Sequence, residues 1–171
     1  MRKTLVLTLL TLLALAASAQ IRIPDSKVVF TLPEGEWKYL QTTKVDKNTT
    51  VYLYSYMASN VIDSQGDTII PHLKVYVRRN YQHSAIDLST DRWMQQPFQS
   101  LDEYTDGLPA PGIGYIGAYT NPLEKKDCVF RMIYFKEKNT AFEFRAETTA
   151  DTYKQFDDMF EQIIRSVTIA K

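Results

Sequence analysis

The hydrophobic pattern changes its period within the last third of the chain, and this change constrains the fold more than any other feature. Apolar segments at 128–135 and 141–146 flank the polar tetrapeptide 136–139, which is typical of a β-hairpin with a short loop. In the second segment, Glu143, Arg145 and Glu147 alternate with apolar residues. This alternation predicts an antiparallel strand with one buried face and one solvated face.

From residue 149 onward the apolar residues recur with the period of an α-helix. Charged residues such as Lys154, Asp158 and Arg165 occupy the opposite side of this pattern. Because an amphipathic helix buries its apolar stripe, we expect it to dock on the sheet. The stripe consists of Tyr153, Phe156, Phe160, Ile163, Ile164 and Val167.

The first half of the chain contains short β-rich segments that are separated by turn-forming residues, as at 33–35 and 63–67. We expect three of these segments to be consecutive antiparallel strands, because the connections between them are short. The segments are residues 28–32, 37–42, 51–58 and 73–79.

Helical signals follow in the middle of the chain. Ser89 or Thr90 can cap a helix, and Pro97 would stop or kink it. A second helical piece is expected after Pro97, because Trp93, Leu101 and Tyr104 recur at helical spacing.

Together these patterns predict a single α+β domain over residues 20–171. Its antiparallel sheet of about six or seven strands carries the C-terminal amphipathic helix and the mid-chain helix.

The first 19 residues are typical of a signal peptide. Arg2 and Lys3 precede an apolar run at 5–17, and Ala17-Ser18-Ala19 supplies the small residues of a cleavage site. Cleavage after Ala19 would leave a mature chain that begins at Gln20 and has no stable membrane anchor. Since no cysteine directly follows the apolar run, attachment of a lipid at that position is not expected. We therefore expect a periplasmic or secreted protein.

Charge and cysteine content exclude several classes of function. The chain has 20 basic and 20 acidic residues, and no basic run is longer than a pair, so we expect no nucleic-acid partner. Cys128 is the single cysteine, so no internal disulfide can form. Its position at the start of an apolar segment favours a buried small hydrophobe over a reactive nucleophile.

The residues that commonly carry catalysis or bind metals are sparse. His72, His83 and Cys128 lack the spacing of a zinc site, and Gly-x-Ser-x-Gly does not occur. We expect no metal, no cofactor and no catalytic residue. His83, which precedes Ser84, could act as a general base, but a solvated histidine is the simpler interpretation.

Two motif matches have ordinary structural explanations. Residues 112–117 match Gly-x-Gly-x-x-Gly, but they follow Pro111 and lead into an extended segment, so no helix is available to hold a phosphate. We interpret them as a strand with close approach of a neighbour. Asp63, Gln65 and Asp67 resemble part of a calcium loop, but Lys74 occupies its twelfth position, and a hairpin turn is expected instead.

Tyrosine is abundant, with 11 residues, and three of them occur at a spacing of two. On a strand, Tyr52, Tyr54 and Tyr56 would project from one face. Either a helix covers that face, or it is an aromatic recognition surface for a partner. Tyr81 and Trp93 are further candidates for binding.

The order of these elements resembles the PsbP-like fold. The resemblance rests on the strand Val-Phe-Thr-Leu-Pro at 29–33, on Trp37, on a mid-chain helix, on the late hairpin, and on the final helix leading into Val167. It covers about residues 28–168. The resemblance implies an α-β-α sandwich and a family of mostly non-catalytic binding or assembly factors, and it supplies no functional motif to transfer.

The sequence thus predicts an exported, non-catalytic module that binds a protein, peptide or glycan. Two alternatives stay open. A carrier of a small apolar ligand would need an enclosed pocket lined by Met57 and aromatic residues. A hydrolase using His83 or His72 would need a serine or aspartate within hydrogen-bond reach of the imidazole.

Overall fold

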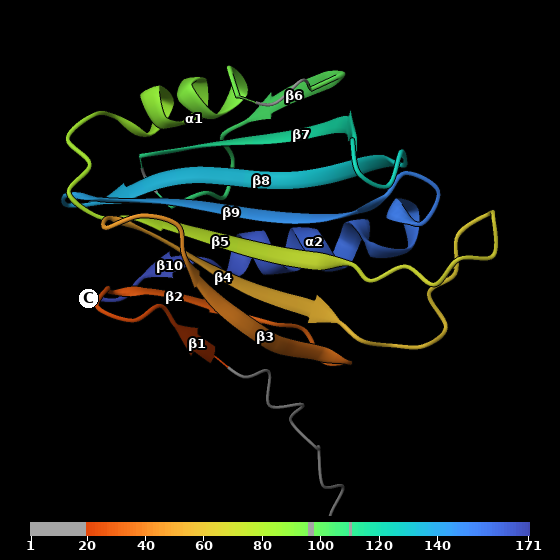
Figure 1. Ribbon diagram of the computed structural model, residues 1–171. Coiled ribbons are helices and arrows are strands. Elements are labelled where there is room, and N and C mark those ends of the chain that lie inside the picture. The colour runs from red at the N-terminus through yellow and green to blue at the C-terminus, as the bar shows by residue number, and fades with distance from the viewer. Residues whose placement is uncertain (1–19, 96–97, 110) are drawn as a thin grey trace, which may run out of the picture.

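A seven-stranded antiparallel sheet organises the molecule, for which a computed structural model describes residues 20–95, 98–109 and 111–171 (Figure 1). In spatial order its strands are β3 (Trp37–Lys44), β4 (Thr49–Tyr56), β5 (His72–Arg78), β9 (Thr140–Thr149), β8 (Asp127–Glu137), β7 (Gly112–Thr120) and β6 (Ser100–Tyr104). A three-stranded sheet has the order β1 (Gln20–Arg22), β2 (Val28–Thr31) and β10 (Thr168–Ile169).

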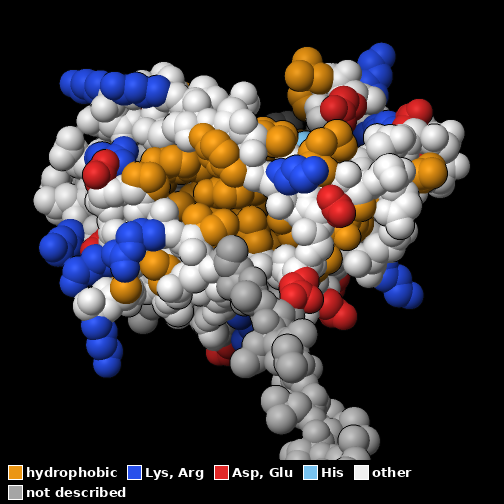
Figure 2. Space-filling view, turned by 90° about the horizontal axis from the view of Figure 1, so that it is seen from below, with side chains coloured by type: hydrophobic (Ala, Val, Ile, Leu, Met, Phe, Trp, Pro, Cys, Tyr) orange, Lys and Arg blue, Asp and Glu red, His pale blue; other side chains and the backbone are white. Residues whose placement is uncertain are grey.

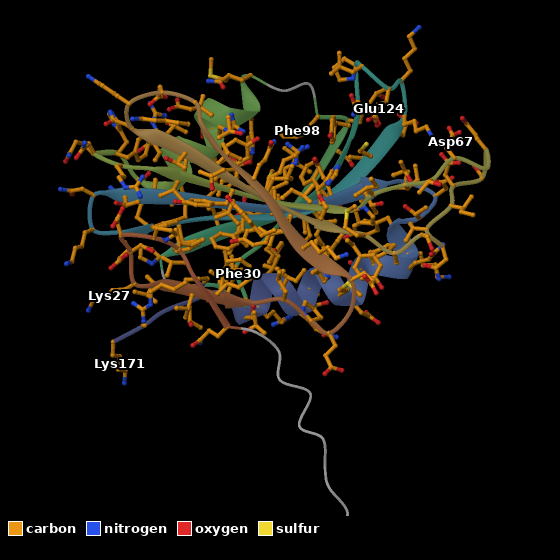
Figure 3. All side chains as sticks on the ribbon, turned by 60° about the horizontal axis from the view of Figure 1, so that its bottom comes forward. Lys27, Phe30, Asp67, Phe98, Glu124 and Lys171 are labelled. Atoms are coloured by element: carbon orange, nitrogen blue, oxygen red, sulfur yellow. The ribbon has the colours of Figure 1, made fainter. Side chains whose placement is uncertain are left out.

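The two helices lie on opposite faces of the large sheet (Figure 3). The helix α2 (Tyr153–Ser166) packs on β8, β9 and β2, and we call this side the α2 face. The helix α1 (Ala85–Trp93) packs on β7 and β8 from the other side, the α1 face. The predicted α+β sandwich, with one helix on each side of an antiparallel sheet, is therefore confirmed.

The larger core lies between the sheet and α2. The ring of Phe30 on β2 contacts the rings of Tyr54 and Phe144 edge-on, with centroids 5.5 and 5.3 Å apart. Phe160 and Ile163 of α2 are completely buried in the same core. The apolar stripe of the final helix docks as its periodicity predicted.

The smaller core lies under α1. Leu88 of α1 packs with Tyr115, Phe130 and Tyr134 of the sheet, and the ring of Trp93 contacts that of Tyr115 at 4.5 Å. Because α1 packs on β7 and β8, it does not cover the half of the α1 face that β3, β4 and β5 form.

The prediction for the start of the mid-chain helix was wrong. Ser84, not Ser89 or Thr90, is the N-cap, and its side chain and that of Asp87 form a capping box. Ser89 is buried inside the helix. Two local hydrogen bonds at Ser84 fix the start five residues earlier than the expected position.

The second helical piece was also wrong, because residues 100–104 form β6. Leu101 pairs with Gly117, and Tyr104 pairs with Gly114. The ring of Tyr104 fills the space beside Gly114, where an added Cβ would lie 2.5 Å from the ring. The glycine-rich segment is therefore β7, a strand with close approach of a neighbour, as predicted. Pro97 lies outside the described residues.

The hairpin of β8 and β9 is confirmed, but its expected solvated face is not. Glu143, Arg145 and Glu147 are each at most 4% exposed. Their ion pairs and the aromatic side chains over them, described below, make this burial possible.

Two further expectations concern the turn and the leader. Residues 63–67 form a turn closed by a bridge between Ile62 and Thr68, as predicted. Residues 1–19 lie outside the described residues, and β1 begins at Gln20. In the part of the chain that the structure describes, no helix is long and apolar enough to cross a membrane.

Candidate functional site

Ionisable side chains of β5 and β9 lie next to each other on the α1 face. The register places His72 opposite Glu147, Lys74 opposite Arg145, and Tyr76 opposite Glu143. Because residues two apart on a strand share a face, these six side chains form two adjacent polar rows. The opposite positions on both strands are apolar and belong to the larger core.

Ion pairs fix the acidic members of these rows. Glu147 accepts a hydrogen bond from Lys74 through Oε1 and forms an ion pair with Arg145, whose Nε lies 2.8 Å from Oε2. Glu143 Oε2 accepts from Nε of Arg92 on α1 at 2.8 Å. Burial acts to raise the pKa of Glu147, but Arg145 and Lys74 outweigh it, so the pKa lies below its ordinary value and the side chain stays charged.

Aromatic rings cover the guanidinium of Arg145. Its Cζ lies 4.6 Å from the ring centroid of Tyr119 and 4.7 Å from that of Phe130. The hydroxyl of Tyr119 also donates to Glu147 Oε2 at 3.2 Å. This cover explains why the predicted wet face is buried: its charges are paired, and rings from β7 and β8 shield them.

A cleft with a volume of about 580 Å³ opens over one end of these rows. Its floor includes His72, Lys74 and Glu147. One wall is formed by residues 67–70, and the other includes Asn121, Glu124 and Lys126. Lys126 pairs with both Asp63 and Asp67, which ties the two walls together. Asp67 and Glu124 lie on neighbouring loops at the same end of the sheet (Figure 3). We call this site the β5–β9 cleft.

His72 is held by a buried hydroxyl. Its Nδ1 lies 2.9 Å from Oγ of Ser55, which is completely buried and makes no other hydrogen bond among the described residues. If Nδ1 carried the proton, the Ser55 hydroxyl would have no acceptor, so the proton belongs on Nε2. Burial, assisted by Lys74, lowers the pKa of His72, which leaves the ring neutral at pH 7.

The hydrolase alternative meets its distance requirement at His72 but not its requirement for access. Ser55 is completely buried and does not line the cleft, so its hydroxyl cannot reach a substrate there. His83 is exposed and stacks edge-on against Tyr81, while the neighbouring Ser84 bonds to Asp87. In the described chain neither histidine has an accessible serine or aspartate partner.

The apolar-carrier alternative fits the cleft poorly. Met57, expected to line its pocket, is 40% exposed and is not part of the cleft wall. The charged floor would have to lose water without gaining a partner if an apolar ligand filled the site. Cys128 lines the cleft as a buried thiol, and burial raises its pKa, so it stays protonated.

The row of three tyrosines faces the larger core. Tyr52 and Tyr54 are buried, and Tyr56 is half-buried with its ring against Phe156 of α2. Of the two alternatives for these tyrosines, a covered face and an exposed recognition surface, the structure shows the covered face. The tyrosines of β7 and β8, such as Tyr115, lie on the α1 face and do not extend this row.

The other two candidates are on the α1 side. Tyr81 is buried near α1, and Trp93 is half-buried against Tyr115. None of the five candidates is exposed, and none lines the β5–β9 cleft. Binding by these residues stays a prediction.

The cleft itself was not predicted from the sequence. Alternation of charged residues was visible on β9, and His72-x-Lys74-x-Tyr76 repeats it on β5. The missing information was the register that puts the two rows side by side, since strands far apart in the chain determine it.

A second surface lies at the β3 edge of the sheet. Seen from below, hydrophobic side chains gather in the middle of the molecule, with charged groups around them (Figure 2). Tyr39 and Leu40 of β3 are 53% and 46% exposed. The pairing with β4 shifts between Tyr39 and Gln41, and such a bulge disfavours addition of another strand at this edge.

Comparisons with known proteins agree with the architecture. No family model matches the sequence, and no curated protein matches it significantly. Among solved structures, the cyanobacterial PsbP of Synechocystis is 10% identical with a TM-score of 0.55, covering 90% of this chain and 93% of that chain.

Two further solved structures have the same arrangement. The Ran-binding protein Mog1p of Saccharomyces cerevisiae is 8% identical with a TM-score of 0.55, covering 90% of this chain and 96% of its own. LpqN, involved in cell envelope biogenesis of Mycobacterium tuberculosis, is 12% identical with a TM-score of 0.51, covering 90% and 91%. At these identities the likeness concerns the fold alone. The chain therefore has the PsbP-like fold that its order of strands and helices resembles.

Proposed function

We propose that the protein is an exported, non-catalytic module that binds a protein or peptide partner at the β5–β9 cleft. The observation that carries this proposal is the combination of a fixed, charged floor with exposed apolar side chains near the rim. A site of this composition gives orientation through its polar groups and contact area through its apolar ones.

The floor is organised before any partner arrives. Glu147 is held by Lys74, Arg145 and Tyr119, which come from three strands of one sheet. Side chains that are locked by such contacts lose little conformational entropy on binding. The site therefore suits recognition of a partner group of defined shape and charge.

The rim provides apolar contact area. Leu123, which precedes the cleft residue Glu124 in the chain, is 91% exposed, the highest value among the large hydrophobic side chains of the described chain. Ile70 in a wall of the cleft is 42% exposed, and Ile62 in the preceding loop is 52% exposed. Exposed apolar residues grouped around a cleft favour a protein partner over a small solute.

Two of the similar structures support a binding or assembly role. One is described as Ran-binding, and another is described as involved in cell envelope biogenesis. At identities of 8% and 12% the likeness concerns the fold, and the partner of the present chain has to be argued from its own site.

Export is supported by the order of charged, apolar and small residues before Gln20. The partner would then be met outside the cytoplasm.

Affinity capture tests the proposal. Tagged protein comprising residues 20–171 is incubated with envelope extract of the native host, and bound proteins are identified by mass spectrometry. We expect Leu123→Asp to lose the partner, because it places a charge on the rim. Met94→Asp is the matched control, since Met94 is 84% exposed at the far end of α1. Equal capture by both variants, or no enrichment by the wild type, would contradict the proposal.

A further inference from the structure

The floor of the β5–β9 cleft has more positive than negative charge. Lys74 and Arg145 both pair with Glu147, whereas Glu143 is neutralised by Arg92 of α1. One cationic charge is therefore left over around Glu147. Because Glu147 and Arg145 are buried, water screens this charge poorly, and its field acts on whatever enters the cleft.

Two side chains that line the floor carry N–H groups with no acceptor among the described residues. Lys74 Nζ has one acceptor, Glu147, so two of its three N–H groups are left over. His72 presents Nε2–H, because its Nδ1 accepts from Ser55. Both residues line the cleft and lie two positions apart on one face of β5, about 7 Å between Cα atoms. Their donors suit the two oxygens of one carboxylate.

The rim has the opposite charge. Asp63 and Asp67 share the single cation of Lys126, which leaves one negative charge over. Glu124 is exposed, makes no ion pair in the described chain, and lies close enough to His72 to act on it electrostatically. A second anion entering past the rim would be repelled, whereas a basic group would be attracted.

From this arrangement we infer that the cleft binds a dipolar peptide segment, with a carboxylate on His72 and Lys74 and a neighbouring lysine or arginine side chain on Glu124 and Asp67. The inference rests on the proposed function and narrows the partner to a peptide in which acid and base lie close together. The cleft volume of about 580 Å³ lies within the range that is usual for ligand-binding pockets in proteins. The carboxylate can belong to a chain terminus or to an acidic side chain.

Short peptides distinguish these two sources of carboxylate. The probes are acetyl-Ala-Lys-Ala with a free C-terminus and acetyl-Ala-Lys-Glu-Ala amide. Acetyl-Ala-Lys-Ala amide lacks the carboxylate, and inorganic phosphate is an anion without a base. Each is titrated into 15N-labelled protein comprising residues 20–171, and amide shifts in β5 and in residues 121–126 are followed. We expect at least one carboxylate peptide to bind about tenfold more tightly than the peptide without a carboxylate.

Variants assign the binding to the cleft. Glu124→Lys reverses the rim charge at an exposed position, and we expect it to lower the affinity for the carboxylate peptide about tenfold. Glu34→Lys makes the same change in an exposed loop outside the cleft and should leave binding unchanged. Lys74→Met should weaken binding as well. Because Lys74→Met also removes a hydrogen-bond partner of the buried Glu147, its effect on binding can come from a change in the floor. Glu124→Lys changes an exposed side chain and is therefore the decisive variant.

Several results would overturn the inference. They are equal affinity for peptides with and without the carboxylate, tighter binding of phosphate than of either carboxylate peptide, or no difference between Glu124→Lys and Glu34→Lys. Such a result leaves the proposed function intact if Leu123→Asp still abolishes capture of the partner. In that case the partner is bound at the rim by other chemistry. If the peptide titrations contradict the inference and Leu123→Asp also captures the partner as the wild type does, the proposed function is contradicted as well.

Discussion

The hydroxyl of Ser55 determines which nitrogen of His72 carries the proton. Ser55 is completely buried and its Oγ lies 2.9 Å from Nδ1, so the ring is fixed as the Nε2–H tautomer. Lys74 disfavours the protonated ring, whereas Glu147 and Glu124 favour it, and burial outweighs both acids. The pKa of His72 therefore lies below its unfolded value.

We predict that His72 is neutral at pH 7, with its proton on Nε2. Because its pKa is lower in the folded state, its contribution to stability is complete above about pH 6.5 and is lost as the pH falls through the folded pKa. Ser55→Ala should raise the pKa of His72, since Nδ1 loses the donor that occupies it. Long-range 1H–15N NMR of the imidazole nitrogens measures both. A proton on Nδ1 at pH 7 would contradict the assignment.

Tyr54 and Tyr104 give a prediction at the alkaline end. Burial is the main cause that raises the pKa of each to about 12, above the ordinary value of 10. Since the neutral forms are favoured in the folded state, their contribution to stability is present below pH 10 and is lost as the pH rises toward 12. Absorbance of tyrosinate, read together with circular dichroism, should show these residues ionising only as the protein unfolds. Complete tyrosine ionisation at pH 10.5 with the fold intact would contradict this.

Among the elements, α2 holds the larger core together. Phe160 is completely buried between the helix and the sheet. We predict that Phe160→Ala lowers the free energy of unfolding by ~3 kcal/mol or more, as expected for truncation of a buried aromatic residue. Gln155→Ala, at an exposed position of the same helix, is the control. Urea unfolding measures both, and an unchanged midpoint for Phe160→Ala would mean that α2 does not dock as described.

Elements set by local sequence were predictable, and elements set by distant contacts were not. The stripe through Phe156 and Phe160 is a local signal, and it predicted α2 and its buried side correctly. The segment at 100–104 has helical spacing, yet pairing with β7 makes it a strand. Likewise, alternation predicted which side Glu147 takes, but not that Lys74 and Tyr119 would bury it. The cleft consists of such cross-strand contacts.

At the scale of the whole molecule, the two faces of the sheet differ in their cover. The α2 face is covered by α2 and by β2 of the small sheet, whereas α1 packs on β7 and β8 of the other face. The cleft opens on the part of the α1 face that β5 and β9 form. The location of the cleft thus follows from the arrangement of the sheet and its two helices.

The processing of the chain is a separate prediction. We expect the exported protein to begin at Gln20, because Ala17-Ser18-Ala19 is the site that signal peptidase requires. The new N-terminal glutamine can cyclise to pyroglutamate. Intact-mass analysis of protein from its native host measures this directly. Retention of residues 1–19 would contradict both the cleavage site and the proposed export.

Photo-crosslinking in the native host tests the central claim, that the β5–β9 cleft is the surface that meets a partner. Benzoylphenylalanine replaces Leu123 at the rim or, as the control, Met94 at the end of α1, both of which are strongly exposed. We predict a discrete adduct of higher mass from position 123 and none from position 94 after irradiation. An adduct from position 94 alone, or no adduct from position 123, would contradict the assignment of the cleft as the binding site.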